Sequence, residues 1–154
     1  MKKQEMIKSK EYQLEIARKV DELVELCHGL AVESGWWSDP ETGERTERND
    51  GELISLMHSE LSEALEGIRK DLPDKHLPDY RNVTVEMGDA LVRILDYCGG
   101  RRLMVGCAMA EKLAYNTRRA DHKASERTKE NGKKFWTGAS NDTHGYRRGA
   151  PDGE

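Results

Sequence analysis

Hydrophobic residues recur at three- and four-residue steps along four stretches of this chain, and polar segments separate the stretches. Such spacing places apolar side chains on one side of a helix, so each stretch predicts an amphipathic helix. The predicted helices cover residues 12–35, 50–70, 82–98 and a stretch that begins near residue 102. We therefore expect an all-α fold, an antiparallel four-helix bundle with a long first loop.

Turn-forming residues mark the connections between these helices. After Trp36 and Trp37, residues 38–50 are polar and contain a proline and a glycine, which predicts the long first loop. Residues 71–81 contain two prolines and are long enough to return the chain antiparallel. Gly99 and Gly100 end the third helix. Residues 137–154 are rich in Gly and Asp, and we expect a disordered tail there.

Two acidic pairs with the same spacing lie in the second and third predicted helices. They are Glu60-x-x-Glu63 and Glu86-x-x-Asp89. Residues three apart project from the same side of a helix, so two antiparallel helices would direct four carboxylates at one point. On a helical projection Glu60 lies inside the apolar arc and Glu63 at its border, while Glu86 lies at the edge of its own arc. Arg93 is placed to hold these carboxylates.

Carboxylates at an apolar border must be protonated, paired or bound to a cation. Oxygen ligands suit a hard ion, so Mg²⁺ is the expected cofactor and Mn²⁺ an alternative. Because the chain is 35% charged, solvated acidic pairs are the competing interpretation, but two pairs on consecutive helices favour a site. A di-iron bundle needs two Glu-x-x-His motifs, and this sequence has one, Glu25-x-x-His28.

The acidic pairs and the strings around them, HSELSEALEGIRK and VEMGDALVRILDYCG, resemble the signature of the MazG-like, all-α nucleoside triphosphate pyrophosphatase superfamily. The resemblance covers about residues 12–136 and defines a predicted domain over residues 1–136. It implies cleavage between the α and β phosphates of a nucleoside triphosphate, which releases a monophosphate and pyrophosphate. The metal ligands would be the four acidic residues, Glu60, Glu63, Glu86 and Asp89. Glu63, at the mobile border, is our choice for the residue that accepts the proton of water.

The resemblance also suggests substrate contacts on other segments. Trp36 and Trp37 follow the first helix, and one of them would stack on the nucleobase; the alternative is that they cover the end of the bundle. Lys112, Asn116 and Arg119 share one face of the fourth helix, where the cations would meet phosphates and the Asn the sugar or base. Solvated charges are the alternative there.

Two further cations, Lys133 and Lys134, resemble the basic segment that follows the last helix in this superfamily and would fold back over the site. A flexible basic tail that contacts nothing is the competing interpretation. Asp96 extends the acidic line along the third helix without belonging to either pair.

Composition limits the partners and the location. Only 36% of residues are hydrophobic and mean hydropathy is −0.86, so one chain has a thin core and we expect a homo-oligomer, a dimer or a tetramer. A net charge of −4 gives no general attraction to nucleic acid or to an anionic membrane. Three cysteines without a disulfide framework, and no signal peptide or long apolar run, predict a cytoplasmic protein.

The substrate remains open at this point. Relatives within the superfamily hydrolyse dUTP or dCTP, general (d)NTPs, or a phosphoribosyl-ATP intermediate, and a nucleotide-pool cleaner is our leading form. A hypothesis from another class is a non-catalytic helical oligomer whose acidic face binds a cation or a protein partner.

Overall fold

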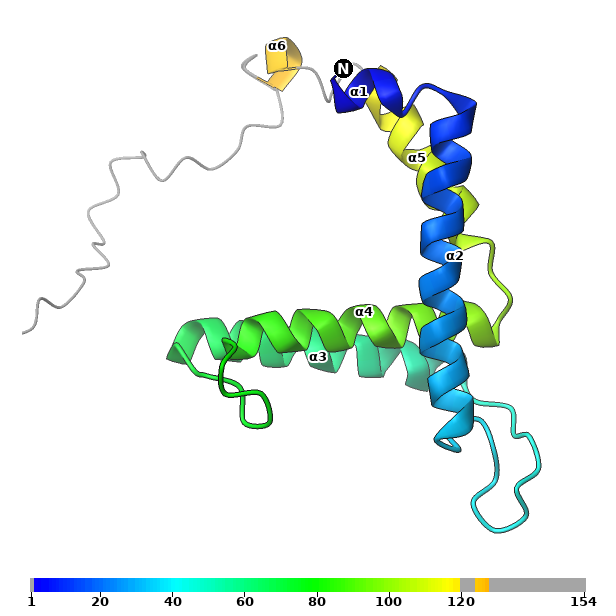
Figure 1. Cartoon of the computed structure of the whole chain (residues 1–154). Helices are drawn as coiled ribbons and strands as arrows, with labels where there is room; N and C mark the ends of the chain where they lie inside the picture. Colours follow the sequence, from blue (N-terminus) through cyan, green and yellow to red (C-terminus); the bar gives the residue numbers. More distant parts are fainter. Residues whose placement is uncertain (1, 120–123, 128–154) are drawn as a thin grey trace, which may run out of the picture. The chain divides into compact units, whose positions relative to one another are not determined.

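The computed structural model describes residues 2–119 and 124–127 of the 154-residue chain. These residues are mostly helical and form no named strand, so the predicted all-α class is confirmed (Figure 1). The helices are α1 (Lys3–Met6), α2 (Lys10–Glu33), α3 (Asp50–Lys70), α4 (Asn82–Gly100), α5 (Val105–Arg118) and α6 (Ala124–Arg127). The chain divides into two compact units, residues 1–115 and 116–154, and the fold described below is that of the first unit.

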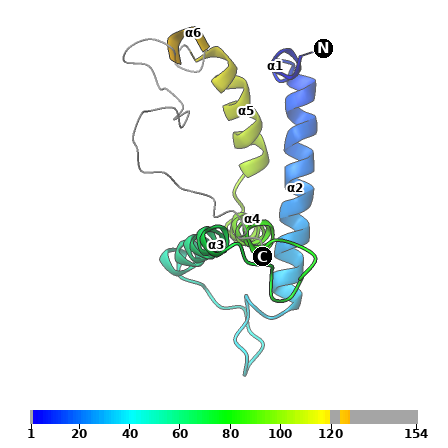
Figure 2. The ribbon, with the colours of Figure 1, turned by 90° about the vertical axis from the view of Figure 1, so that its left-hand side faces the viewer.

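Helices α3 and α4 form an antiparallel hairpin, and they lie side by side in both views (Figures 1 and 2). Helix α3 is capped at its N-terminus by Asn49, whose side chain accepts a hydrogen bond from the amide of Glu52 at 3.1 Å. At its other end α3 stops at Asp71, which has a left-handed backbone with φ of 48°. Gly67 then lies against Asn82, the first residue of α4.

The loop between α3 and α4 is ordered by Asp74, whose side chain is buried. One carboxylate oxygen accepts hydrogen bonds from the backbone amides of His76 and Leu77, at 2.9 and 2.7 Å. These bonds, above all that from Leu77, hold the pKa of Asp74 below its ordinary value, against an opposing effect of burial. The backbone amide of Asp74 also donates to the carbonyl of Tyr80 at 3.0 Å, which closes the loop.

Helix α2 packs on α4 at the opposite end of the hairpin and crosses it (Figure 1). The glycine pair at the end of α4 permits this contact, because Gly99 lies against the ring of His28 and Gly100 against the ring of Trp37. Trp37 is 2% exposed and is the largest fully buried side chain in the described part of the chain. Arg48 and Arg101 lie over its ring, at 6.0 and 5.7 Å from the centroid.

The apolar arcs predicted for α3 and α4 are only partly covered. Leu53 and Ala64 of α3 are buried, together with Ala90 of α4. Four other apolar residues of α3 are 43–57% exposed: Ile54, Leu61, Leu65 and Ile68. Because α3 packs chiefly on α4 and α2 packs on α4, the described part of one chain does not surround α3 with apolar neighbours.

Two further predictions concern the C-terminal tail and the membrane. The predicted tail over residues 137–154 lies outside the described residues. Among the helices that the structure describes, none combines the length and the apolar character that a membrane crossing requires.

Candidate metal centre

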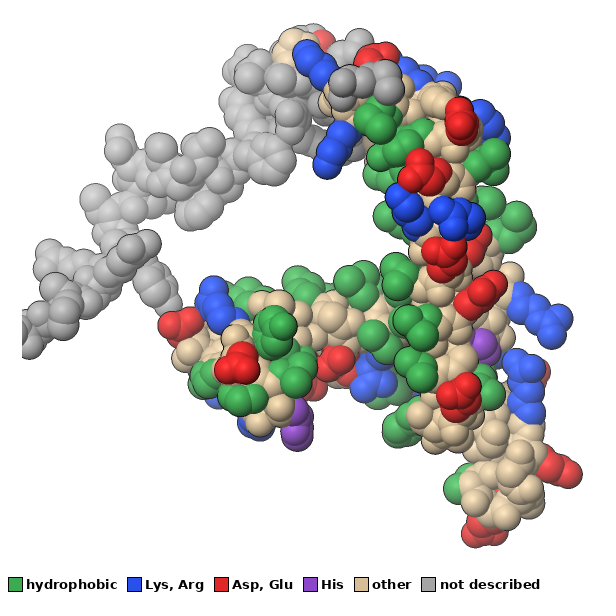
Figure 3. Space-filling view, in the orientation of Figure 1, with side chains coloured by type: hydrophobic (Ala, Val, Ile, Leu, Met, Phe, Trp, Pro, Cys, Tyr) green, Lys and Arg blue, Asp and Glu red, His purple; other side chains and the backbone are tan. Residues whose placement is uncertain are grey.

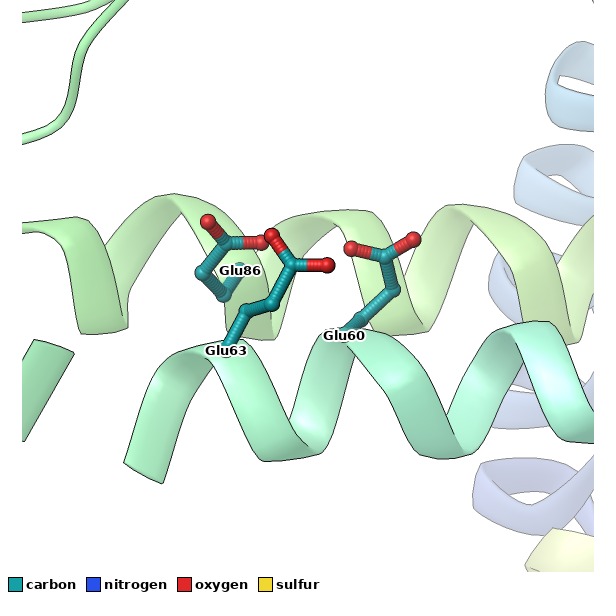
Figure 4. A group of neighbouring side chains, drawn as sticks. All are labelled: Glu60, Glu63 and Glu86. Atoms are coloured by element: carbon teal, nitrogen blue, oxygen red, sulfur yellow. The ribbon is translucent and has the colours of Figure 1, made fainter. Parts of the chain in front are cut away.

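Three carboxylates converge where the middle of α3 meets the first turns of α4. Glu60, Glu63 and Glu86 each offer an oxygen atom, and these atoms lie within 4.8 Å of one another (Figure 4). Glu60 and Glu63 come from α3 and Glu86 from α4. The i, i+3 spacing and the antiparallel hairpin together produce the arrangement, so three of the four predicted acidic ligands are brought together.

Two of these carboxylates are withdrawn from solvent. Glu60 is 6% and Glu86 is 8% exposed, whereas Glu63 is exposed. Nδ2 of Asn82 donates to Oε1 of Glu86 at 2.7 Å, and Nε of Arg93 donates to Oε1 of Glu60. Burial of a charged group is costly unless it is paired, so each buried acid has one polar partner.

The electrostatics of Glu86 reflect its crowded position. Burial raises the pKa of Glu86 above its ordinary value of 4.5, and the nearby carboxylates of Glu63 and Glu60 raise it further. The hydrogen bond from Asn82 opposes the shift. A divalent cation among the three carboxylates would remove this repulsion, and carboxylate oxygens are the donors that Mg²⁺ and Mn²⁺ prefer. The donor set therefore fits the expected metal.

Asp89, the fourth predicted ligand, does not belong to the group. It is exposed on α4, three residues beyond Glu86, and none of its oxygens joins the other three. The sequence predicts that Arg93 holds the carboxylates, and its guanidinium crosses from α4 to pair with Glu60 on α3. The helical projection found this arginine correctly and could not show which helix it would contact.

The two tryptophans have opposite environments. Trp36 is 66% exposed, whereas Trp37 is buried and donates its indole N–H to Oδ1 of Asp96 at 2.8 Å. The structure thus places Trp37 in the position of a packing residue and leaves the ring of Trp36 accessible. His28 also contacts Oδ1 of Asp96 through Nδ1, at 2.8 Å. Sequence reasoning missed this junction, in which three elements meet at one carboxylate.

The predicted phosphate-binding residues lie on and after α5. Lys112 is exposed, lies 5.1 Å from the centroid of the Tyr115 ring and forms no ion pair with the acidic group among the described residues. Asn116 and Arg119 belong to the second unit, where the Arg119 amide donates to the Asn116 carbonyl at 3.3 Å. Oδ1 of Asn116 is buried and has no hydrogen-bond partner in the part of the chain described. The predicted contacts of Lys133 and Lys134 lie outside the described residues.

No family model, curated protein or solved structure matches the chain.

Proposed function

We propose that this protein is a metal-dependent nucleotide pyrophosphohydrolase, which cleaves a (d)NTP between its α and β phosphates to a (d)NMP and pyrophosphate. The observation that carries the proposal is the convergence of Glu60, Glu63 and Glu86, two of them buried, on one helical hairpin. Solvated acidic pairs would have no reason to gather and would be exposed. The motifs around these residues resemble those of the MazG-like superfamily, which gives the reaction type.

The proposed site would hold Mg²⁺ through Glu60, Glu63 and Glu86, with Asp89 reaching it from the next turn of α4. Bound Mg²⁺ supplies Lewis-acid polarisation of a phosphoryl oxygen and lowers the pKa of a coordinated water. Glu63 is the exposed member of the group, so its carboxylate is free to accept a proton from water. Asn82 orients Glu86 through its 2.7 Å hydrogen bond.

Arg93 supplies the positive charge nearest to the carboxylates. It is paired with Glu60 and is 43% exposed at its side chain, so it can leave this carboxylate without crossing a packed core. If Glu60 held a divalent cation, the Arg93 guanidinium would be available to donate to a phosphate oxygen of the substrate. Within the first unit, the exposed ring of Trp36 and the exposed Lys112 complete the proposed substrate contacts.

The active form is, in this proposal, a homo-oligomer built on the α3–α4 hairpin. The exposed apolar residues of α3 have counterparts on α4 in Met87, Leu91 and Ile94, which are 48%, 59% and 37% exposed and spaced i, i+4, i+7. Figure 3 shows hydrophobic side chains along the hairpin of α3 and α4. Viewed along each helix from its N-terminus, the exposed apolar stripe lies clockwise of the residues at the contact between α3 and α4. Because the two helices are antiparallel, this places both stripes on the same side of the hairpin. A second hairpin packed there would complete a four-helix bundle.

The reaction is tested by incubating the protein with Mg²⁺ and a panel of NTPs and dNTPs, with separation of the mono- and diphosphate products and an assay for pyrophosphate. We expect monophosphate and equimolar pyrophosphate, lost in Glu60→Gln. The matched control is Glu66→Gln, because Glu66 lies on the same helix, is exposed and pairs with Lys70. Diphosphate and orthophosphate as products would contradict the proposed cleavage.

Calorimetric titration with Mn²⁺ separates a failed reaction from a failed site. Binding by the wild type and by Glu66→Gln, but not by Glu60→Gln, would support the metal centre even if every nucleotide in the panel were a poor substrate. Metal binding without turnover on any nucleotide, phosphoribosyl-ATP included, would favour the non-catalytic cation-binding oligomer instead. Absence of Mn²⁺ binding would refute the site.

The assembly is tested separately by sedimentation equilibrium. Leu65→Lys combined with Leu91→Lys charges the exposed apolar side of the hairpin, and we expect it to dissociate the oligomer while the circular dichroism stays helical. Leu26→Lys is the control, since Leu26 is 57% exposed on α2. A wild-type protein that is monomeric at high concentration would refute the assembly without affecting the metal titration.

A further inference from the structure

A cavity lies in the first unit, at a distance from the acidic group. It has a volume of about 440 Å³ and is lined by α2, by the end of α4 and by the start of α5. Small-molecule sites typically have volumes of about 300–1,000 Å³, so the size suits a ligand. Cys98, which lines it, is twelve residues from Glu86 on the same helix, or about 18 Å at the helical rise of about 1.5 Å per residue. The cavity is therefore separate from the proposed metal centre.

One side of α2 supplies most of the polar lining. Asp21, Glu25 and His28 line the cavity with the spacing i, i+4, i+7, which places them on a single face of the helix. Neither carboxylate makes a hydrogen bond or an ion pair with another residue in the described part of the chain. Asp21 lies against Gly106 of α5, where an added Cβ would be 3.0 Å from its Cγ. Both residues are exposed, so their carboxylates lie where the cavity opens to solvent, and two negative charges there favour a positively charged ligand.

His28 adds a nitrogen whose orientation is fixed. Its Nδ1 lies 2.8 Å from Oδ1 of Asp96, and since a carboxylate only accepts, Nδ1 carries the proton. In the neutral form of the ring the lone pair is therefore on Nε2, which has no hydrogen-bond partner among the described residues. The ring packs edge-on against Trp37, with centroids 5.1 Å apart and an interplanar angle of 82°, so it has little freedom to turn.

The remaining lining is largely apolar and comes from Val24, Leu103, Met104 and Cys107. Arg102 is the one basic side chain among the lining residues besides the imidazole, and it is exposed. Hydrogen-bond acceptors therefore outnumber donors, and aliphatic and sulfur-bearing groups are available to cover a ring or a short chain. A ligand with an apolar body and several N–H donors satisfies both features.

We propose that this cavity binds a small organic cation, an amine or amidine with an apolar body, whose N–H groups reach Asp21, Glu25 and Nε2 of His28. Asp96 is then a positioning residue, because it fixes the ring of His28 and has no place in the lining itself. The site makes no use of the acidic group on the hairpin and does not depend on the proposed hydrolysis.

The test follows the imidazole signals of His28 by NMR, assigned with a His28→Gln variant, during titration with three probes of the same ring size. Benzamidine is cationic, benzamide is neutral and benzoate is anionic. We expect benzamidine alone to shift the His28 signals, and Glu25→Gln to weaken this binding by about tenfold, as expected when a carboxylate loses its charge in such a pair. Glu22→Gln is the control, because Glu22 is exposed on α2 outside the cavity and pairs with Arg18.

Several results would overturn the proposal. Equal shifts with all three probes would show that the apolar lining alone is responsible, and no shift with millimolar benzamidine would exclude the site. A response of His28 to stoichiometric Zn²⁺ in the absence of any response to benzamidine would assign the same residues to a metal ion instead. The ¹⁵N shifts of His28 provide a second readout, since a proton on Nε2 in the neutral ring would contradict the predicted tautomer.

Discussion

Gly100→Ala and Gly88→Ala are two chemically identical changes in α4 for which the structure predicts opposite effects on stability. A Cβ added at Gly88 would meet no atom within 4 Å. One added at Gly100 would lie 2.8 Å from Cζ3 of Trp37 and closer still to two other carbons of the ring. The pair therefore measures how firmly the buried indole is held, and helix propensity cancels in part, because Gly88 lies inside α4 and Gly100 is its last residue.

The magnitude follows from the environment of Trp37. Replacing Gly by Ala within a helix stabilises it by about 0.5–1 kcal/mol, which is the expected effect at Gly88. At Gly100 the ring would have to move, and overpacking of this kind costs about 1–3 kcal/mol. The ring cannot retreat freely, because its N–H donates to Asp96 and two arginines lie over it. Loss of that hydrogen bond would add about 0.5–1.5 kcal/mol.

We expect the free energies of unfolding of the two variants to differ by roughly 2–4 kcal/mol, measured by urea denaturation at one fixed protein concentration. In a chain of this size each kcal/mol shifts Tm by about 2–4 °C, so the melting temperatures should differ by roughly 4–16 °C. The concentration must be matched because association would itself stabilise the fold. A Gly100→Ala protein as stable as Gly88→Ala would refute the packing of Trp37 on α4.

Three other substitutions test the charges of the hairpin. Arg93→Met should destabilise the metal-free protein by about 1–3 kcal/mol, because it leaves the buried Glu60 without a cation. In the same urea assay, saturating Mg²⁺ should recover most of this lost stability. The raised pKa of Glu86 means that its carboxylate binds a proton more tightly in the folded protein than in the unfolded chain, so stability should fall as pH rises above about 4.5. The Glu86→Gln variant should lack this fall of Tm with pH when Tm is measured without metal. The lowered pKa of Asp74 has the opposite sign, and Asp74→Asn should reduce the loss of stability as pH falls below about 3.8.

The local features of the fold could be predicted because they depend on neighbouring residues. The start of α3 at Asn49 and the turn after Lys70 follow from capping chemistry and from prolines in the next segment. The convergence of Glu60 with Glu86 could also be predicted. Two amphipathic helices joined by a loop pack antiparallel through their apolar faces, so the residues at the borders of those faces lie close together. Periodicity could not separate Asp89 from Glu63: each lies three residues beyond a buried glutamate and is exposed, yet only Glu63 has an oxygen atom within the group.

The junction around Trp37 could not be predicted from periodicity. The sequence contains a signal for it, since Gly99 and Gly100 leave space where His28 and Trp37 approach α4, but two glycines at a helix end are equally typical of a terminator. Asp96 was treated as an extension of the acidic line because its partners lie 59 and 68 residues away in the sequence. Contacts across such separations depend on how helices cross, which a helical wheel does not contain.

The positions of the carboxylates and of the apolar stripes imply that assembly and metal binding are separable. Both exposed apolar stripes lie on one side of the contact line: Ile54, Leu61, Leu65 and Ile68 on α3, and Met87, Leu91 and Ile94 on α4. Glu63 and Asp89 lie on the other side, together with the exposed Val92 of α4. A second hairpin that covered the apolar side would therefore leave the edge with Glu63 open to solvent and to a nucleotide. Charging Leu65 and Leu91 should consequently abolish the oligomer while Mn²⁺ still binds, and Glu60→Gln should abolish Mn²⁺ binding in an intact oligomer. If instead both properties were lost together in each variant, the carboxylates would have to lie within the interface, and the assembly proposed for the apolar side would be wrong.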